Sequence, residues 1–181
     1  LQLTIIGIGI LWHEGYSDQY LDKDGFPQHC RQEYDRSHLM DTGLTVEITI
    51  KGEPLTCRIW KTEAYHNAPL YLLDANLPDG LHAWVTRRLY APSPEERIAG
   101  AMVLGMGGVR LLRKIGIQAD VYHLNEGNTA FAGLELIREK MALGSDFETA
   151  WEETRQQVVF TTHTPVMAGN EVYDHDLLRQ M

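Results

Sequence analysis

The stretch VVFTTHTPVMAGNE, Val158–Glu171, decides the fold and contains the first candidate site. Its opening run, Val158-Val159-Phe160, is continuous and apolar, which is typical of a strand that is covered on both faces of a parallel sheet. Three threonines, one histidine and a proline follow, so His163 stands where the strand ends. Ligands of open parallel sheets bind just beyond the carboxyl ends of the strands. The stretch therefore predicts a parallel sheet with His163 at its ligand-binding edge.

The segments before this strand alternate between strand and helix patterns. ADVYHLN, Ala119–Asn125, predicts a strand, and a helix is expected from about Thr129 to Leu143, where Gly144 stops it. Ser145 with Glu148 matches a capping box that opens the next helix. This alternation indicates an α/β protein whose parallel sheet is flanked by helices.

The first half of the chain is richer in strand patterns. Residues 1–11 predict a buried strand, and residues 15–29 predict a polar, turn-rich loop. In the β-rich segment at about 41–76, TVEITI alternates apolar and polar residues, LTCRIW suits its antiparallel partner, and APLYLLDAN predicts a further strand. The expected fold is thus a Rossmann-like parallel sheet with flanking helices and a small antiparallel β patch.

A long buried helix is expected after this β-rich segment. Ser93 at the N-cap, Pro94 at the first helical position and Glu96 form a capping box. Apolar or small residues then recur every three or four positions, at Ile98, Met102, Gly105, Val109 and Leu112. The pair Gly107-Gly108 costs about 1 kcal/mol per residue relative to alanine, so we expect another backbone to pack closely there.

Composition excludes several classes of function. The 181-residue chain has ordinary hydrophobic (44%) and charged (23%) content, which suits one globular domain. Its net charge of −9 argues against nucleic-acid or anionic-membrane partners. Two distant cysteines support neither a disulfide framework nor a zinc site, and no other metal site is predicted. Because few cysteines and no disulfide framework are typical of a reducing compartment, a cytoplasmic location fits best. The apolar start is too short to span a bilayer, and because it begins directly in a strand pattern we expect an excised piece of a longer chain.

Polar side chains gather after two predicted strands, in HLNEGN (His123–Asn128) and TTHTP (Thr161–Pro165). The side chains suited to hydrogen-bonding the hydroxyls of a sugar are Asn125, Glu126, Asn128, Thr162 and His163. Structural roles compete with this interpretation. Asn128 or Thr129 could cap the next helix, Glu126 is favoured near a helix N-terminus by the dipole alone, a histidine at a strand end is often structural, and His123 suits a satisfied core histidine.

Six segments together resemble the α-glucan phosphorylases, the glycogen and maltodextrin phosphorylase family, especially its shorter bacterial branch. They are GIGILWHEGY, DKDGF, PLYLLDAN, VLGMGGVRLLRKIGI, VYHLNEGNTAFAGLELIREKM and VVFTTHTPVMAGNE, in family order from end to end. The resemblance implies that residues 1–181 are a partial N-terminal domain of a GT-B glycosyltransferase, whose C-terminal cofactor-binding domain is absent.

The implied reaction is phosphorolysis. Inorganic phosphate attacks the terminal α-1,4-glucosyl unit of glycogen or maltodextrin and releases glucose 1-phosphate. The implied cofactor is pyridoxal 5′-phosphate, with its attachment lysine outside this chain and no cofactor-binding residue in it. We therefore expect the isolated chain to be inactive, and apolar surface exposed by truncation favours self-association, for example as a homodimer.

Carried over by position, the resemblance implies that His163 is the catalytic histidine that lines the glucosyl site. Asn125 and Glu126 match the polar pair beside the sugar path. Asn128 stands where the family has the histidine of NEGH, and Ala101 replaces a carboxylate. These departures indicate either a divergent branch or a catalytically silent glucan-binding or regulatory relative. A nucleotide-sugar GT-B glycosyltransferase is a third interpretation.

Overall fold

The computed structural model describes residues 4–15, 17–31, 36–167 and 170–181. Three predicted segments extend outside these ranges: residues 1–3 of the first strand, Tyr16 of the expected loop, and residues 168–169 of the stretch that decides the fold. The strands are β1 (Gly7–Ile10), β2 (Ser17–Leu21), β3 (Pro27–Arg31), β4 (Met40–Ile50), β5 (Glu53–Thr62), β6 (Leu70–Asp74), β7 (Tyr122–Asn125) and β8 (Val158–Thr161).

The helices follow the expected order. The α-helices are α1 (Pro94–Met102), α2 (Gly108–Lys114), α3 (Phe131–Ala142), α4 (Phe147–Gln157) and α5 (His175–Gln180). A π-helical turn, η3 (Val103–Gly107), joins α1 to α2, and the short 3-10 turns are η1 (Ala64–His66), η2 (Ala83–Val85) and η4 (Gly127–Thr129). No helix in the described ranges is long and apolar enough to cross a membrane.

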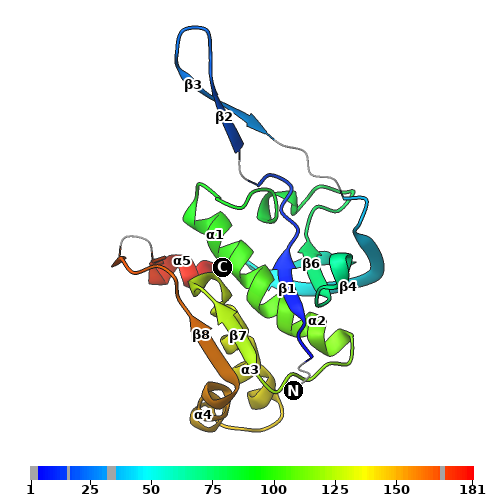
Figure 1. Ribbon diagram of the computed structural model, residues 1–181. Helices are drawn as coiled ribbons and strands as arrows, with labels where there is room; N and C mark the ends of the chain where they lie inside the picture. Colours follow the sequence, from blue (N-terminus) through cyan, green and yellow to red (C-terminus); the bar gives the residue numbers. More distant parts are fainter. Residues whose placement is uncertain (1–3, 16, 32–35, 168–169) are drawn as a thin grey trace.

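The strands form a mixed sheet and a separate parallel pair. The four-stranded sheet has the order β1-β6-β5-β4, in which β1 and β6 are parallel and the other pairs are antiparallel. The predicted partners TVEITI and LTCRIW pair with Val46 opposite Cys57 and Ile48 opposite Leu55. β7 and β8 pair in parallel on the other side of α1, η3 and α2 (Figure 1). The α/β fold class with an antiparallel patch is confirmed, although the parallel strands belong to two sheets.

The central helix carries the predicted cap and the predicted buried stripe. Ser93 accepts a hydrogen bond from the backbone N–H of Glu96 (3.1 Å), which satisfies one of the donors left unpaired at a helix start. Ile98, Met102 and Val109 are at most 7% exposed. The main core packs this helix against the mixed sheet, and a smaller core packs α2 and α3 against β7.

Glycines in this helix allow two different close contacts. A Cβ added at Gly107 would lie 2.7 Å from the Leu73 side chain, and one at Gly108 would lie 3.0 Å from the Ile8 side chain. The expected backbone contact occurs instead at Gly105, where a Cβ would lie 2.7 Å from the carbonyl carbon of Phe131. The prediction that another backbone packs against Gly107-Gly108 was wrong, because side chains of the strands fill that space. Gly105 is the glycine that sets how closely α3 approaches.

Residues 15–29 are not a loop. β2 and β3 form an antiparallel hairpin, with Asp18 opposite Cys30, and it projects away from the rest of the molecule (Figure 1). The Asp22 carboxylate accepts hydrogen bonds from the backbone N–H groups of Asp24 and Phe26, and Gly25 has a φ of 83°. A polar segment can therefore form strands here, because the turn residues close the hairpin although all of β2 is exposed.

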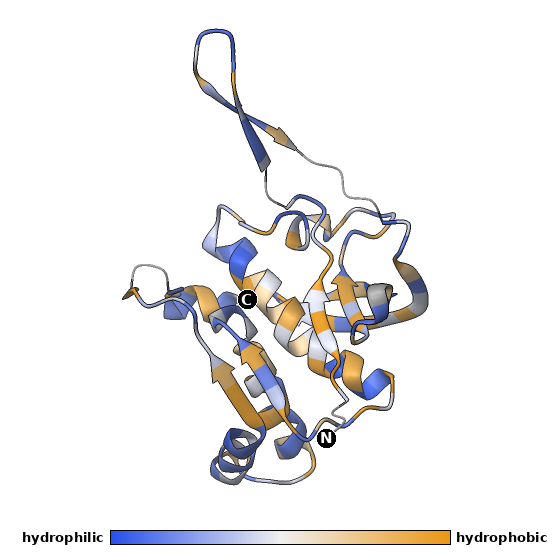
Figure 2. Ribbon diagram, in the orientation of Figure 1, coloured by the Kyte–Doolittle hydropathy of each residue, from blue (hydrophilic) through white to orange (hydrophobic). Residues whose placement is uncertain are grey.

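Two details of the last third also differ from expectation. The N-cap of α4 is Asp146, whose carboxylate accepts from the backbone N–H of Thr149 (2.8 Å). Asp146 thus takes the capping role that was predicted for its neighbour Ser145. β8 is not covered on both faces, since Val159 and Phe160 are 52% and 54% exposed, and Figure 2 shows this apolar strand at the side of the molecule. A continuous apolar run shows that a strand is apolar on both sides, but it does not show what covers each side.

A buried charge network fixes α3 against α2. Glu135 is 1% exposed and accepts hydrogen bonds from Arg110 (2.8 Å) and from Arg138 (2.8 Å). Burial pushes the pKa of Glu135 up, but the hydrogen bonds and charges of Arg138 and Arg110 outweigh it, so the pKa lies below its ordinary value. The helix that follows η4 is thereby held in place.

Candidate functional site

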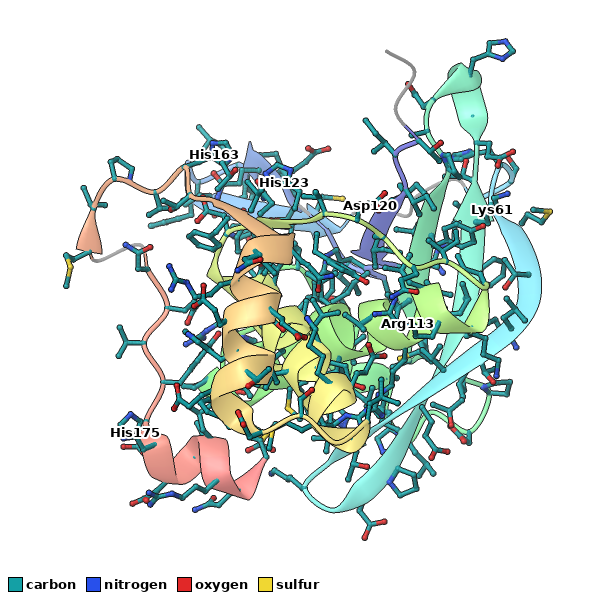
Figure 3. All side chains as sticks on the ribbon, turned by 90° about the horizontal axis from the view of Figure 1, so that it is seen from below. Lys61, Arg113, Asp120, His123, His163 and His175 are labelled. Carbon is teal, nitrogen blue, oxygen red and sulfur yellow. The ribbon has the colours of Figure 1, made fainter. Side chains whose placement is uncertain are left out.

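The carboxyl ends of β7 and β8 lie side by side, as the sequence predicts. Asn125 and Thr161, the last residues of the two strands, are opposite each other in the parallel register. The backbone N–H of Glu126 continues the ladder by donating to the carbonyl of Thr161 (2.9 Å). His163 is exposed rather than enclosed by core side chains, and Figure 3 places it at one end of the molecule. Four of the five predicted sugar-binding residues, those at positions 125, 126, 162 and 163, therefore lie together.

Glu126 organises this strand end. Its carboxylate accepts hydrogen bonds from the backbone N–H of His163, from the Thr162 hydroxyl (3.0 Å) and from the Thr164 hydroxyl (3.4 Å). One side chain from the loop after β7 thus orders the three residues that follow β8. This role differs from the predicted favourable placement near a helix dipole, because both carboxylate oxygens accept hydrogen bonds from the loop after β8.

The backbone of Glu126 is strained in a way that supports a special role. Its φ of 64° and ψ of 169° lie in a region that essentially only glycine adopts. The backbone hydrogen bond from His163, followed by the Thr162 hydroxyl and the charge of the His163 side chain, lowers the pKa of Glu126. The carboxylate is therefore ionised and acts as an acceptor, and its contacts hold the unfavourable backbone.

The imidazole of His163 is anchored from one side only. Its Nε2 lies 3.1 Å from the Asn125 Oδ1; because an amide oxygen can only accept, Nε2 carries the hydrogen in this contact. In the neutral ring Nδ1 is then an acceptor, which suits the hydrogen of a ligand hydroxyl. The arrangement can bind a hydroxyl, orient it and hold it beside a fixed carboxylate.

Asn128 is separate from this group. It is exposed in η4, and no hydrogen bond joins it to the other four candidates within the described ranges. The capping alternative is not seen either: Ala130 is the N-cap of α3 without a side-chain bond, and the Thr129 hydroxyl donates to the carbonyl of Glu126 (2.7 Å).

His123 is not the core histidine expected from its place inside a strand. Its side chain is exposed, and its Nε2 lies 2.7 Å from the Thr161 hydroxyl. In β7 the residues alternate between faces, and His123 falls on the face opposite the buried Tyr122. Its partner Thr161 directly precedes Thr162 of the candidate site, but His123 makes no hydrogen bond to the four grouped candidates within the described ranges.

The departure at Ala101 lies in the protein interior. Ala101 is 3% exposed within α1. A carboxylate at this position would need a buried partner.

A cleft of about 410 Å³ lies at the other end of β7 and β8. Tyr122 begins β7, Gln157 directly precedes β8, and both line this cleft together with the ends of α2 and α3. It is distinct from the candidate site at the carboxyl ends. Among the described residues, no three His, Cys, Asp or Glu side chains gather as a metal site.

Comparisons with known proteins show what the chain as a whole is similar to. No family model matches the chain. A maltodextrin phosphorylase from Thermococcus litoralis is 37% identical over 96% of this chain, and glycogen phosphorylases from Mycobacterium tuberculosis and Aquifex aeolicus are 34% and 28% identical over 99% of it. The catalytic domain of starch synthase IV from Arabidopsis thaliana, solved with ADP and acarbose, superposes on 74% of this chain and 24% of its own at 19% identity and a TM-score of 0.47.

These relatives are much longer than the chain, which spans 22%, 23% and 27% of their respective lengths. The aligned region nevertheless extends over 96–99% of the 181 residues. Over nearly its whole length the chain is similar to one part of glycogen and maltodextrin phosphorylases, which are glycosyltransferase-type enzymes.

Proposed function

We propose that the protein takes part in the phosphorolysis of α-1,4-glucans, with inorganic phosphate and maltodextrin or glycogen as substrates and glucose 1-phosphate as product. In this proposal residues 1–181 form part of the N-terminal domain of a GT-B enzyme, in the cytoplasm, and contribute one wall of the glucosyl site. The observation that carries the proposal is the exposed His163, held by Asn125 and by the Glu126 carboxylate at the paired carboxyl ends of β7 and β8.

The geometry suits a positioning role for His163. Cleavage of a glucosyl bond develops positive, oxocarbenium-like charge at the reacting carbon. Fixed dipoles and acceptors near that carbon stabilise the charge without reorganising. The Glu126 carboxylate is already committed to three donors, so we assign it to orienting the loop and assign the imidazole of His163 to the substrate hydroxyl.

The cofactor implied by the family, pyridoxal 5′-phosphate, does not fit the residues in hand. Its aldehyde would need a buried lysine that is free to react. Within the described ranges Lys61 pairs with Glu63, Lys140 donates to Thr154 and Gln157, and Lys51 pairs with Glu95, while the remaining lysines, at positions 23 and 114, are exposed. We therefore propose that the lysine that holds the cofactor lies in another part of the full-length protein.

The test is phosphorolysis by the full-length protein, measured as glucose 1-phosphate release from maltodextrin. His163→Ala removes a side chain that positions the reacting sugar, and we expect kcat to fall by about a hundredfold, the lower end for the loss of one preorganised polar group at a reacting centre. His175→Ala, at an exposed helix start distant from His163 in Figure 3, is the matched control and should leave the rate unchanged. Equal rates for wild type and His163→Ala would remove His163 from the mechanism.

A second candidate function follows from Asn128. This exposed residue stands apart from the other four candidates, at a position where the family has histidine. A glucan-binding relative without turnover would keep the ordered loop and lose such a contact. Calorimetric titration of the full-length protein with maltotetraose, with and without phosphate, separates the two: heat of binding without glucose 1-phosphate release favours the silent relative.

A further inference from the structure

The second parallel pair, β1 and β6, also ends in a histidine that its neighbouring strand holds. β1 and β6 pair from Gly7 opposite Leu70 to Ile10 opposite Leu73. His13 follows β1, and its Nε2 lies 2.8 Å from the Oδ1 of Asp74, the last residue of β6. The arrangement repeats that of β8 and β7, where His163 is held by Asn125.

Asp74 is built into the structure as a fixed acceptor. It is 3% exposed, and it accepts from the Trp60 indole N–H (3.1 Å) and from the backbone N–H of Asn76 (2.9 Å) as well as from His13. The Thr86 hydroxyl lies 3.5 Å from the same carboxylate. These contacts come from β5, the loop after β6 and the residue after η2. They hold the Asp74 carboxylate in one orientation, independently of the His13 imidazole.

The contact with Asp74 fixes the tautomer of His13. Because an ionised carboxylate only accepts, Nε2 carries the hydrogen and Nδ1 presents a lone pair in the neutral ring. Nδ1 lies 3.2 Å from the Asn76 amide nitrogen and 3.2 Å from an Arg36 guanidinium nitrogen. The His13 side chain is 20% exposed and Asn76 is exposed. The Nδ1 lone pair thus accepts from these two donors, and a ligand hydroxyl would have to displace one of them.

Both histidines belong to the same end of the molecule. Figure 1 shows β1 and the β7–β8 pair running in the same sense, so their carboxyl ends point the same way. α1 links the two clusters, because it contacts η2, next to Thr86, and η4, next to Glu126. The ligand crevice of a parallel sheet lies along this end.

We propose that His13, oriented by Asp74, forms a second saccharide-binding wall of the crevice, with Arg36 and Asn76 as flanking donors. This inference rests on the proposed function and extends it. The matching ligand chemistry is a vicinal diol: one hydroxyl displaces Arg36 or Asn76 and donates to Nδ1, and its neighbour accepts from the displaced donor. Asp74 is a positioning residue, because it acts on the ligand only through the imidazole.

The test uses the full-length protein and maltotetraose. His13→Phe keeps a ring of similar size and removes both hydrogen-bonding nitrogens. We expect KM for maltotetraose to rise about tenfold, which is the value of one hydrogen bond of about 1.4 kcal/mol, with KM for phosphate unchanged. The thermal midpoint should fall somewhat, because the buried Asp74 carboxylate loses a donor. His13→Gln, which can donate to Asp74 and still accept, should recover part of the loss.

A binding measurement makes the outcome independent of turnover. In the wild type, the NMR signals of the His13 ring should shift on addition of maltotetraose and stay in place on addition of inorganic phosphate. A shift with phosphate alone, or unchanged maltotetraose affinity in a folded His13→Phe protein, would overturn the proposal and leave His13 as a structural latch. If the wild type bound maltotetraose at His13 but released no glucose 1-phosphate, phosphorolysis would fail while the second wall would stand.

Discussion

Among single residues, Glu126 does most to order the candidate site through its carboxylate. It holds the residues after β8 from a backbone conformation that disfavours any side chain. Glu126→Gln keeps the size but turns an N–H₂ group toward donors. We therefore expect faster amide hydrogen exchange at His163 and Thr164 and weaker maltotetraose binding. Thr129→Val removes a hydroxyl that, among the described residues, donates to the Glu126 carbonyl and to no side chain of the candidate site; it is the control. Equal exchange rates in Glu126→Gln and wild type would show that the carboxylate does not order the loop.

The same contact predicts a pH dependence. The hydrogen bond from the His163 backbone lowers the pKa of Glu126 relative to its ordinary value of 4.5. A group with a depressed pKa stabilises the folded state above the unfolded pKa, and this contribution is lost as pH falls through the folded pKa. The ordered loop should persist at pH 4.5 and loosen only at lower pH. In an NMR titration from neutral to acid pH, the His163 amide signal should therefore shift mainly below pH 4.5. Loosening that is complete above pH 4.5 contradicts the contact.

Single residues also show where the sequence was sufficient. The polar types at positions 125, 126, 162 and 163 predicted a shared site because two parallel strands must end at one edge. Position 128 could not be resolved, since a short turn decides whether its side chain joins the group. The His13–Asp74 pair was missed because its members lie 61 residues apart and no pattern in the sequence joins the two segments that carry them.

At the scale of elements, the spacing between the central helix and α3 is set by a glycine. Gly105→Ala would place a Cβ less than 3 Å from backbone atoms of Phe131 and Ala132. We expect a loss of about 3 kcal/mol in the free energy of unfolding, the upper end for overpacking, measured by urea denaturation. Gly133→Ala is the matched control: it lies in α3 with no atom within 4 Å of the added Cβ and should stabilise by about 0.5–1 kcal/mol. A neutral Gly105→Ala would mean that α3 does not pack there.

Elements were predicted well where a period and a cap coincide. The Ser93 cap and the buried stripe that follows it are confirmed because each turn of the helix repeats the same constraint. The β2–β3 hairpin was missed because its side chains are polar and exposed, so only the turn around Gly25 signals it. The prediction that β8 is covered on both faces was wrong, because the residues that could cover a strand come from other segments of the chain.

At the scale of the whole molecule, the parallel strand pairs on the two sides of α1 turn their carboxyl ends the same way (Figure 1). The family and the α/β fold were predictable from the sequence, since six motifs in order carry the family resemblance. The division into a mixed sheet and a separate pair was not, because strand order follows from contacts between distant segments.

The most direct measurement is a structure of the full-length protein with bound maltotetraose. The account predicts a glucosyl hydroxyl within hydrogen-bond distance of the His163 imidazole, in the loop that Glu126 orders. Saccharide bound only elsewhere, for example in the cleft beside Tyr122, with the His163 imidazole contacting solvent alone, would contradict it.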